Sequence, residues 1–164
     1  MNKVVEFLNA NPVQYLATVG RDGKAKCRPF MFAGELDGKL WFCTNNRKDV
    51  YKDMQQNPQV EISVSSPSYA WIRLHGKAVF ENNMAAKEMC IQNPIVKGQY
   101  QTAANPIFEV FYLDNPHGVT PPRSWIDSQV QQIGNRQGDV YANQIEIREY
   151  EYLLYSWNAW QSTG

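Results

Sequence analysis

The sequence predicts a mainly β protein, a small antiparallel barrel with flanking helices. Two Asp-Gly pairs, Asp22-Gly23 and Asp37-Gly38, each lie between two strand-like runs, which is the strongest short signal for a β-hairpin. Further short alternating runs are separated by local turns, which favours an antiparallel barrel over a parallel sheet. The sequence contains neither a GxGxxG nor a GxxxxGK(S/T) motif, so the usual doubly wound nucleotide-binding folds are not expected.

The first half of the chain predicts a helix, a three-stranded meander and a second helix. Asn2 can cap the first helix, and Asn11-Pro12 ends it. The two Asp-Gly turns then connect the three strands of the meander. Asn45 or Asn46 can cap the next helix, which Asn57-Pro58 ends. The expected strands cover residues 14–19, 27–33 and 39–44, and the second helix covers residues 47–56.

The second half predicts two further strands, a helix and a last strand. Gly76 lies inside a long strand-like run, where a glycine often marks a bulge. Asn82 or Asn83 can cap the helix that follows. The expected elements are strands 59–65 and 70–80, a helix that ends near Gln92, and a strand over 106–113.

The charge balance argues against binding to nucleic acid or to an acidic membrane. Lys and Arg together number 16, as do Asp and Glu, so the formal net charge of the 164-residue chain is zero. No run approaches the roughly 18 apolar residues that a membrane span needs. The first residues are too short and too charged a stretch to be a signal peptide.

The cysteines and histidines do not predict a metal site. Cys27, Cys43 and Cys90 form no close pair in the sequence, and two of them lie in strand-like runs. Reduced thiols in a cytoplasmic protein are therefore expected rather than disulfides. His75 and His117 are too few to supply a zinc site.

The stretch from Cys27 to Ala33 carries an arginine inside an apolar strand. An unpaired buried charge is costly, so Arg28 is expected to meet an anion. Pro29 cannot donate to a sheet ladder and therefore marks an edge or a bulge. A bound anionic group that meets the sheet would explain both residues. The alternative is a guanidinium that reaches water or a neighbouring carboxylate.

A second candidate anion site lies at the start of the helix 47–56. Lys48 and Lys52 are four residues apart and share one helix face, close to the end of the strand that holds Thr44. A helix start, two ammonium groups and a hydroxyl group could together bind a phosphate. The alternative is a solvated helix face, which is the usual interpretation of a lysine pair.

A third candidate lies on strand 70–80, where Trp71, Arg73 and His75 share one face. Trp71 and Arg73 could line a pocket with a planar occupant. His75 is more simply interpreted as a partly exposed strand residue.

Four segments resemble the pyridoxamine 5′-phosphate oxidase-like proteins, which are FMN-binding split barrels. Their order and spacing carry the resemblance, which covers about residues 3–113. The segments are residues 15–30, 40–44, 54–60 and 73–78. The pattern is most similar to the small general-stress and nitroimidazole-resistance-like members. The substrate-binding arginine and histidine motifs of authentic pyridoxamine phosphate oxidase have no match here.

The resemblance implies a six-stranded antiparallel split β-barrel that is active as a homodimer, with one FMN in each cleft between subunits. In the family, the arginine strand contacts the flavin, the third strand and the next helix hold the phosphate, and a later strand supplies a residue near the ring. Carried over to this sequence, the flavin contacts are Arg28, Pro29, Phe30 and Met31. The phosphate contacts are Thr44, Asn45, Lys48 and Lys52, and the residues near the ring are Trp71 and Arg73. The usual lysine position falls on Val50, so Lys48 or Lys52 would have to serve instead.

The resemblance also implies an FMN-dependent oxidoreductase that acts on an unidentified small substrate. No acid–base residue that hydride transfer would demand is evident, so no catalytic residue is assigned. Two alternatives stay open: a flavin or haem carrier or sensor without turnover, and a cofactor-free dimeric interaction module.

The chain is expected to divide into a flavin-binding barrel over residues 1–115 and an aromatic-rich extension over residues 116–164. The family pattern stops near Asn115, and no lysine follows Lys97. The aromatic surplus of the extension needs burial, so we expect it to cover the partner subunit or the flavin cleft.

Overall fold

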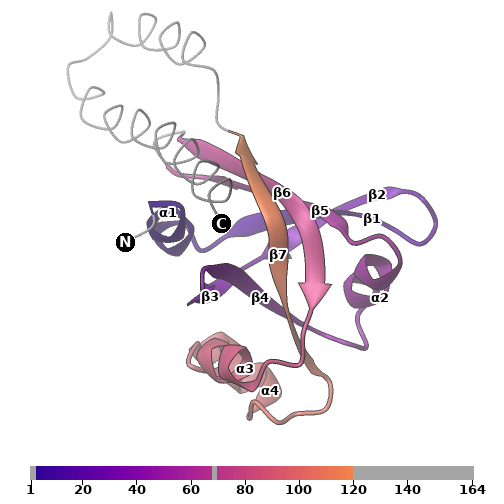
Figure 1. Ribbon diagram of the computed structural model, residues 1–164, viewed down its shortest axis with the longest axis vertical. Helices are drawn as coiled ribbons and strands as arrows, with labels where there is room; N and C mark the ends of the chain where they lie inside the picture. The colour runs from indigo at the N-terminus through magenta and orange to yellow at the C-terminus, as the bar shows by residue number, and fades with distance from the viewer. Residues whose placement is uncertain (1–2, 68–69, 120–164) are drawn as a thin grey trace, which may run out of the picture.

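The computed structural model describes residues 3–67 and 70–119, which form a curved seven-stranded antiparallel sheet and four helices (Figure 1). The helices are α1 (Lys3–Ala10), α2 (Asp49–Gln56), α3 (Met84–Ile91) and α4 (Pro94–Tyr100). The strands are β1 (Gln14–Val19), β2 (Ala25–Phe30), β3 (Phe32–Leu36), β4 (Lys39–Asn45), β5 (Gln59–Ser65), β6 (Trp71–Phe80) and β7 (Phe108–Val119). The predicted class is confirmed, with seven strands in the described part of the chain rather than six.

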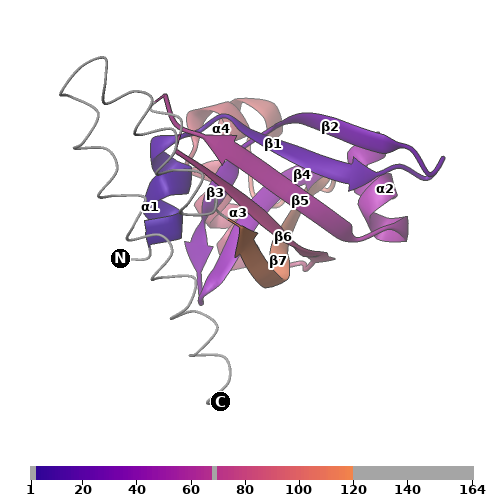
Figure 2. The same cartoon turned by 90° about the horizontal axis from the view of Figure 1, so that it is seen from above.

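Strands β2 and β3 follow each other in the chain but lie at opposite edges of the sheet. The strand order is β2-β1-β5-β6-β7-β4-β3, and Met31 alone separates β2 from β3. The sheet is therefore curved, because Met31 keeps the end of β2 next to the start of β3; Figure 2 shows β2, β1, β5, β6 and β7 following one another across it. The ring of Phe30, at the end of β2, lies 6.5 Å from the ring of Phe42 and 5.9 Å from the ring of Phe111.

This topology corrects the predicted three-stranded meander. The strand that carries Arg28 pairs with β1, whereas β4 pairs with β3 and β7. Both Asp-Gly hairpins are present, but the run 27–33 is divided between two edges of the sheet at Met31. Phe30 and Phe32 both pack on the same core, so their alternation with Met31 continues across the division. For that reason the sequence reads as one strand.

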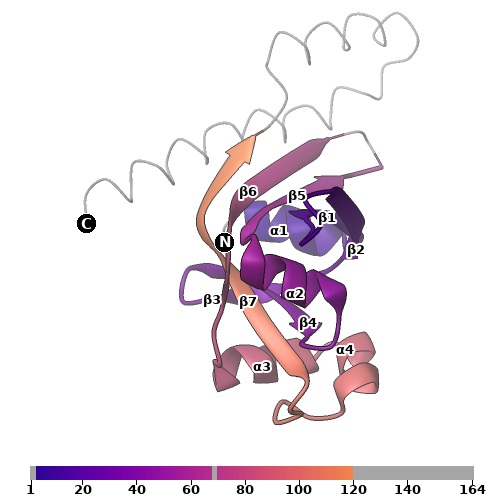
Figure 3. The ribbon, with the colours of Figure 1, turned by 90° about the vertical axis from the view of Figure 1, so that its right-hand side faces the viewer.

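Two apolar clusters cover the two faces of β4 and β7. The inner cluster fills the curve of the sheet, and its fully buried members include Leu8, Leu16, Phe42, Ile62 and Phe111. The outer cluster joins β4 and β7 to α3 and α4, which lie together at one end of the molecule (Figure 3). Each large side chain buried in this way stabilises the fold by about 1.5–3 kcal/mol. We call the face of the sheet that carries the inner cluster the inner face, and the opposite one the outer face.

The elements predicted for the middle of the chain are largely confirmed. Strand β5 has the predicted bounds, and a register shift between His75 and Lys77 places a bulge at Gly76. Asn83 caps α3 by accepting a 3.0 Å hydrogen bond from the backbone N–H of Ala86. Helix α4 was not predicted. Gln92 is the C-cap of α3, and Asn93 caps a new helix, in which Pro94 takes the first position.

The last described strand extends further than the sequence indicated. Strand β7 continues to Val119, beyond the predicted strand end at residue 113 and the predicted domain boundary at residue 115. From residue 120 onwards, the predicted extension lies outside the described residues. In the two described ranges, no helix has the length and the apolar character that crossing a membrane requires.

Candidate functional site

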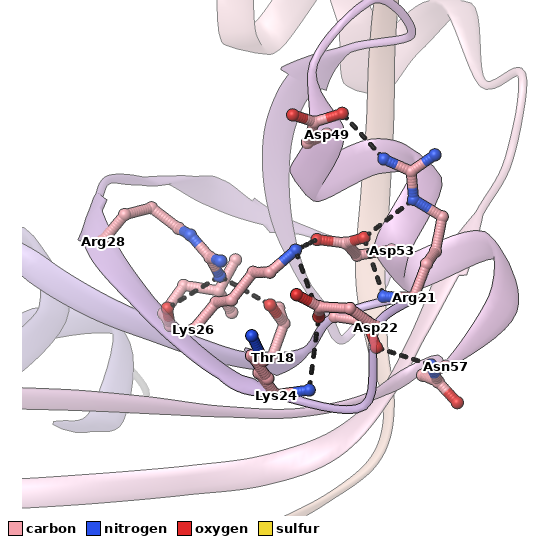
Figure 4. A network of polar contacts seen from close by, with 11 residues as sticks. Thr18, Arg21, Asp22, Lys24, Lys26, Arg28, Asp49, Asp53 and Asn57 are labelled. Carbon is pink, nitrogen blue, oxygen red and sulfur yellow. Dashed lines mark hydrogen bonds and ion pairs between the residues drawn. The ribbon is translucent and has the colours of Figure 1, made fainter.

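A buried carboxylate joins α2 to the tip of the β1–β2 hairpin (Figure 4). Asp53 is fully buried in α2, on the same side of the helix as Met54. Its Oδ1 accepts hydrogen bonds from the backbone N–H of Arg21 at 3.1 Å and from Nε of Arg21 at 3.0 Å. Its Oδ2 accepts a hydrogen bond from Nζ of Lys26 at 3.1 Å. One buried side chain of the helix therefore contacts two residues of the hairpin.

The ionisation of this network follows from its hydrogen bonds. The backbone N–H and the side chain of Arg21, followed by Lys26, lower the pKa of Asp53 to about 2. The hydrogen bond to Asp53 in turn raises the pKa values of Arg21 and Lys26. All three groups are therefore charged at neutral pH. Asp49 adds an exposed ion pair to Arg21 at 2.7 Å.

Arg28 lies two residues beyond Lys26 on the same inner face of β2, but its partners are neutral. Its Nη1 donates to the backbone oxygen of Leu16 at 3.1 Å and to the hydroxyl of Thr18 at 2.8 Å. The side chain is half-buried, and within residues 3–67 and 70–119 it makes no ion pair with a carboxylate. The guanidinium is therefore oriented by β1 and keeps donors available for an anion.

Thr44 carries a buried hydroxyl group that has no hydrogen-bond partner among residues 3–67 and 70–119. The residue is 1% exposed and, by alternation with Phe42, points to the inner face at the end of β4. Glu109 of β7 lies opposite Thr44 in the ladder, and its carboxylate accepts from Nδ2 of Asn46 at 3.0 Å. An unsatisfied buried hydroxyl costs about 1–3 kcal/mol, which makes Thr44 a candidate for a ligand contact.

Asn45 shapes the turn that leads into α2. Its Oδ1 accepts hydrogen bonds from the backbone N–H groups of Arg47 and Lys48, both at 3.1 Å. Lys48 occupies the N-cap position, and the structure shows no side-chain capping bond there. Both Lys48 and Lys52 are exposed on α2. Thr44, Asn45 and Lys48 thus lie in or just before the turn into α2 and Lys52 in its first turns, and the Asn45 side chain is engaged in the structure of that turn.

The remaining predicted contacts of the arginine stretch pack into the protein. The Phe30 side chain lies on the inner cluster, next to Phe42 and Phe111. Met31 packs against the outer cluster, and its sulfur accepts from Nδ2 of Asn93 at 3.6 Å. Since β2 is an edge strand, part of its backbone is free of sheet pairing and can face a ligand.

The third predicted group lies on the other face of the sheet. A row of paired residues crosses four strands there: Pro29, Tyr15, Ser63 and Arg73. The guanidinium carbon of Arg73 lies 5.9 Å from the ring centroid of Trp71, and its Nε lies 3.5 Å from the carboxylate of Glu61. Within one chain, Trp71 and Arg73 are therefore separated by the sheet from Arg28 and Thr44.

The outer face of the β1–β2 hairpin is apolar along its whole length. Three ladder pairs carry it: Tyr15 with Pro29, Ala17 with Cys27, and Val19 with Ala25. Tyr15 is 49% exposed and Val19 is 43% exposed. We call these six residues the hairpin patch.

Sequence reasoning missed the network around Asp53. One signal was available, because an acidic residue next to Met54 on the inward side of an amphipathic helix requires a cationic partner. Arg21 and Lys26 flank the first Asp-Gly turn, but nothing in their spacing indicated which helix they would contact.

The curved antiparallel sheet, whose edge strands β2 and β3 are joined through Met31 around the inner cluster, has the arrangement of a split barrel. A family model described as pyridoxamine 5′-phosphate oxidase matches residues 1–136, and the chain belongs to this family. A search of curated proteins gave no match. The resemblance inferred from the sequence is thereby confirmed.

Solved structures give the same result. A NimC/NimA family protein from Clostridium acetobutylicum is 32% identical, with a TM-score of 0.67 over 75% of this chain and 85% of that one. General Stress Protein 26 from Bacillus anthracis is 21% identical, with a TM-score of 0.62 over 72% and 90% of the two chains. A putative pyridoxamine 5′-phosphate oxidase from Listeria innocua is 24% identical, with a TM-score of 0.58 over 72% and 94%. The last two show the likeness of fold alone.

Proposed function

We propose that the protein binds FMN as a homodimer and acts as an FMN-dependent oxidoreductase on a small substrate. The observation that carries this proposal is Arg28, a half-buried guanidinium that β1 orients through neutral acceptors and that no carboxylate in the described residues neutralises. Membership of the pyridoxamine 5′-phosphate oxidase family supports a flavin as the anionic ligand.

The phosphate of FMN would lie at the start of α2. The buried hydroxyl of Thr44 would gain its missing partner there, and Lys48 and Lys52 would supply positive charge. The N-terminus of α2 adds backbone donors and a favourable dipole. Each charge-assisted hydrogen bond to a phosphate contributes about 1.5–3 kcal/mol to binding, so a small number of them is sufficient to hold the phosphate.

The division of the site residues between two faces favours a dimer. Trp71 and Arg73 would approach a flavin held by the other chain, because the sheet separates them from Arg28 of their own chain. The hairpin patch supplies an apolar surface that a second copy would cover. Burial of such a patch is a usual driving force for association.

The flavin, when bound, supplies the redox chemistry, and the protein residues bind and orient it. Arg28 is fixed by Thr18, and the aromatic ring of Trp71 offers a wall for a planar group. No residue is assigned to proton transfer. We place this function in the cytoplasm, which the free thiols of Cys27, Cys43 and Cys90 support.

The absorption spectrum of the purified protein tests the cofactor. Bands near those of free flavin support the proposal, and a Soret band would indicate the haem alternative. A protein that shows neither, and that retains no flavin after incubation with FMN and removal of the unbound cofactor, would indicate a cofactor-free module. Titration with FMN and riboflavin then measures the contribution of the phosphate, and deazaflavin F420 is included as a competitor. Reduction by NAD(P)H, followed by transfer to an electron acceptor, separates an enzyme from a carrier.

The matched variants for this titration are Arg28→Gln and Arg73→Gln. Both remove one positive charge from a strand, but Arg28 is proposed to meet the phosphate and Arg73 the ring, so only Arg28→Gln should separate FMN from riboflavin. Arg28→Gln is expected to weaken FMN binding by about tenfold or more, the value of one charged hydrogen bond, and to leave riboflavin little changed. Equal losses for FMN and riboflavin would contradict the placement of the phosphate.

A further inference from the structure

We propose that Asp53 is a positioning residue for the phosphate site: it fixes α2, with Lys48 and Lys52, at the correct distance from Arg28 on β2. This inference rests on the proposed function, because it names what holds the two halves of that anion site together. Asp53 itself is buried and would touch neither the phosphate nor the flavin.

The contacts of Asp53 connect the two elements that carry the cations. One half of the proposed site is the exposed side of α2, and the other half is the inner face of β2. Asp53 accepts three hydrogen bonds from the hairpin, two from Arg21 and one from Lys26. Lys26 and Arg28 lie on the same face of the same short strand, so the position of one constrains the other.

Met54 and Val50 pack α2 on the inner cluster, and the other polar contacts between α2 and the hairpin are weaker than those of Asp53. Asn57, just after α2, donates to the backbone oxygen of Gly20 at 3.5 Å. Asp49 contacts Nη2 of Arg21, but its side chain is 76% exposed, and exposed ion pairs contribute little. The three hydrogen bonds that the fully buried carboxylate of Asp53 accepts are therefore the polar contacts expected to set the place of the helix (Figure 4).

Asp53 also determines which cation is open to a ligand. Arg21 and Lys26 both direct charged nitrogens at its two oxygens, at 3.0 and 3.1 Å. Their charge is thereby compensated inside the protein. Arg28 has no such partner in the described residues, so the inner face of β2 presents one uncompensated guanidinium beside a compensated ammonium.

The test compares Asp53→Asn with Asp49→Asn. Both variants remove one carboxylate from α2, both carboxylates contact Arg21, and the two residues are one helical turn apart. They differ in burial: the side chain of Asp53 is 0% exposed and that of Asp49 is 76% exposed. The quantities measured are the dissociation constants of FMN and of riboflavin for each full-length variant.

The direction of the change separates the explanations. Loss of a negative charge alone would tighten FMN binding in both variants. A positioning role predicts that Asp53→Asn weakens FMN binding by about tenfold or more and riboflavin binding by less than about twofold, whereas Asp49→Asn does not weaken FMN. Tighter FMN binding by Asp53→Asn, or equal losses for both ligands, would overturn the inference.

A double-mutant cycle shows whether Asp53 acts through the lysines of α2. In a Lys48→Gln/Lys52→Gln background, Asp53→Asn is expected to have little further effect on the ratio of FMN to riboflavin affinity. A full, additive effect would mean that Asp53 acts by another route and would overturn the inference.

If Asp53→Asn does not fold, Asp53→Glu keeps the charge but lengthens a fully buried side chain, and the same loss of FMN preference is expected. Failure of both variants to fold would reduce Asp53 to a stability role and would also overturn it.

Hydrogen exchange gives a readout without a ligand. Asp53→Asn is expected to speed amide exchange in α2 and at the hairpin tip, and Asp49→Asn to leave it close to wild type. If the wild-type protein binds no FMN, the proposed function fails, and the exchange data still decide whether Asp53 holds α2 in place. Unchanged exchange in Asp53→Asn would refute the positioning role.

Discussion

The guanidinium of Arg28 donates a 2.8 Å hydrogen bond to the hydroxyl of Thr18 across the β1–β2 ladder. Thr18 is 4% exposed, so this contact lies at the border of the core and holds the arginine in one direction. A charged group held by a neutral hydroxyl keeps its charge available to a ligand.

Replacement of Thr18 by Val is therefore expected to weaken FMN binding without unfolding the protein. Valine has nearly the shape of threonine but accepts no hydrogen bond, so Arg28 loses one of its two anchors. The expected loss is about two- to tenfold in FMN affinity, the value of one hydrogen bond. Quenching of flavin fluorescence measures it. Thr18→Ser keeps the hydroxyl and serves as the control, with an affinity close to wild type.

Replacement of Thr44 by Val is expected to have opposite effects on stability and on binding. The buried hydroxyl of Thr44 has no partner in the part of the chain that the structure describes, so its removal should stabilise the ligand-free protein by about 1 kcal/mol. The same change should weaken FMN binding, because the hydroxyl is a proposed phosphate contact. Urea unfolding with and without FMN measures both quantities. A variant that is less stable than wild type without FMN would show that the hydroxyl has a structural partner.

Acid should destabilise the protein through Asp53. Its pKa is about 2 in the folded protein, below the ordinary value of 3.8, so the folded state favours the charged form. This contribution to stability is complete above about pH 4 and is lost as the pH falls towards 2. Urea unfolding followed by circular dichroism at each pH should show the free energy of unfolding falling through this window. Asp53→Asn should lack this part of the pH dependence. Asp49→Asn should retain it.

Replacement of Tyr15 by Glu is expected to dissociate the proposed dimer and leave the monomer folded. Tyr15 is 49% exposed in the single chain, so the change removes little from the monomer core. A charge in the middle of the hairpin patch should raise the dimer dissociation constant by at least about thirtyfold, as for a hot-spot residue. Sedimentation velocity measures it. Ile95→Glu, at a position in α4 that is 72% exposed and away from the hairpin patch, should leave the dimer intact.

Local patterns were sufficient to predict much of the fold. The alternation of Val60, Ile62 and Val64 and the glycine at position 76 determine β5 and the bulge of β6 by short-range chemistry. The two edges of the sheet could not be predicted, because side chains alternate in the same way on both sides of Met31. Pairing between β4 and β7 also depends on residues far apart in the chain.

The site residues remain a prediction, and their geometry was largely hidden from the sequence. The sequence led us to expect an anion, water or a carboxylate at Arg28, and the structure shows two neutral partners from β1 instead. The sequence could not show that Trp71 and Arg73 lie on the opposite face from Arg28, since that depends on the register of four strands. Burial of Asp53 was equally hidden, because it requires a hairpin from a distant part of the chain.

The passage from β2 to β3 through Met31 leaves the backbone no slack. Because Met31 alone connects the two edge strands, the covalent chain as well as side-chain packing keeps the sheet curved at this point. Residues inserted beside Met31 would allow the two edge strands to separate. Insertions in the Asp22-Gly23 and Asp37-Gly38 turns, which lie before β2 and after β3, should be tolerated.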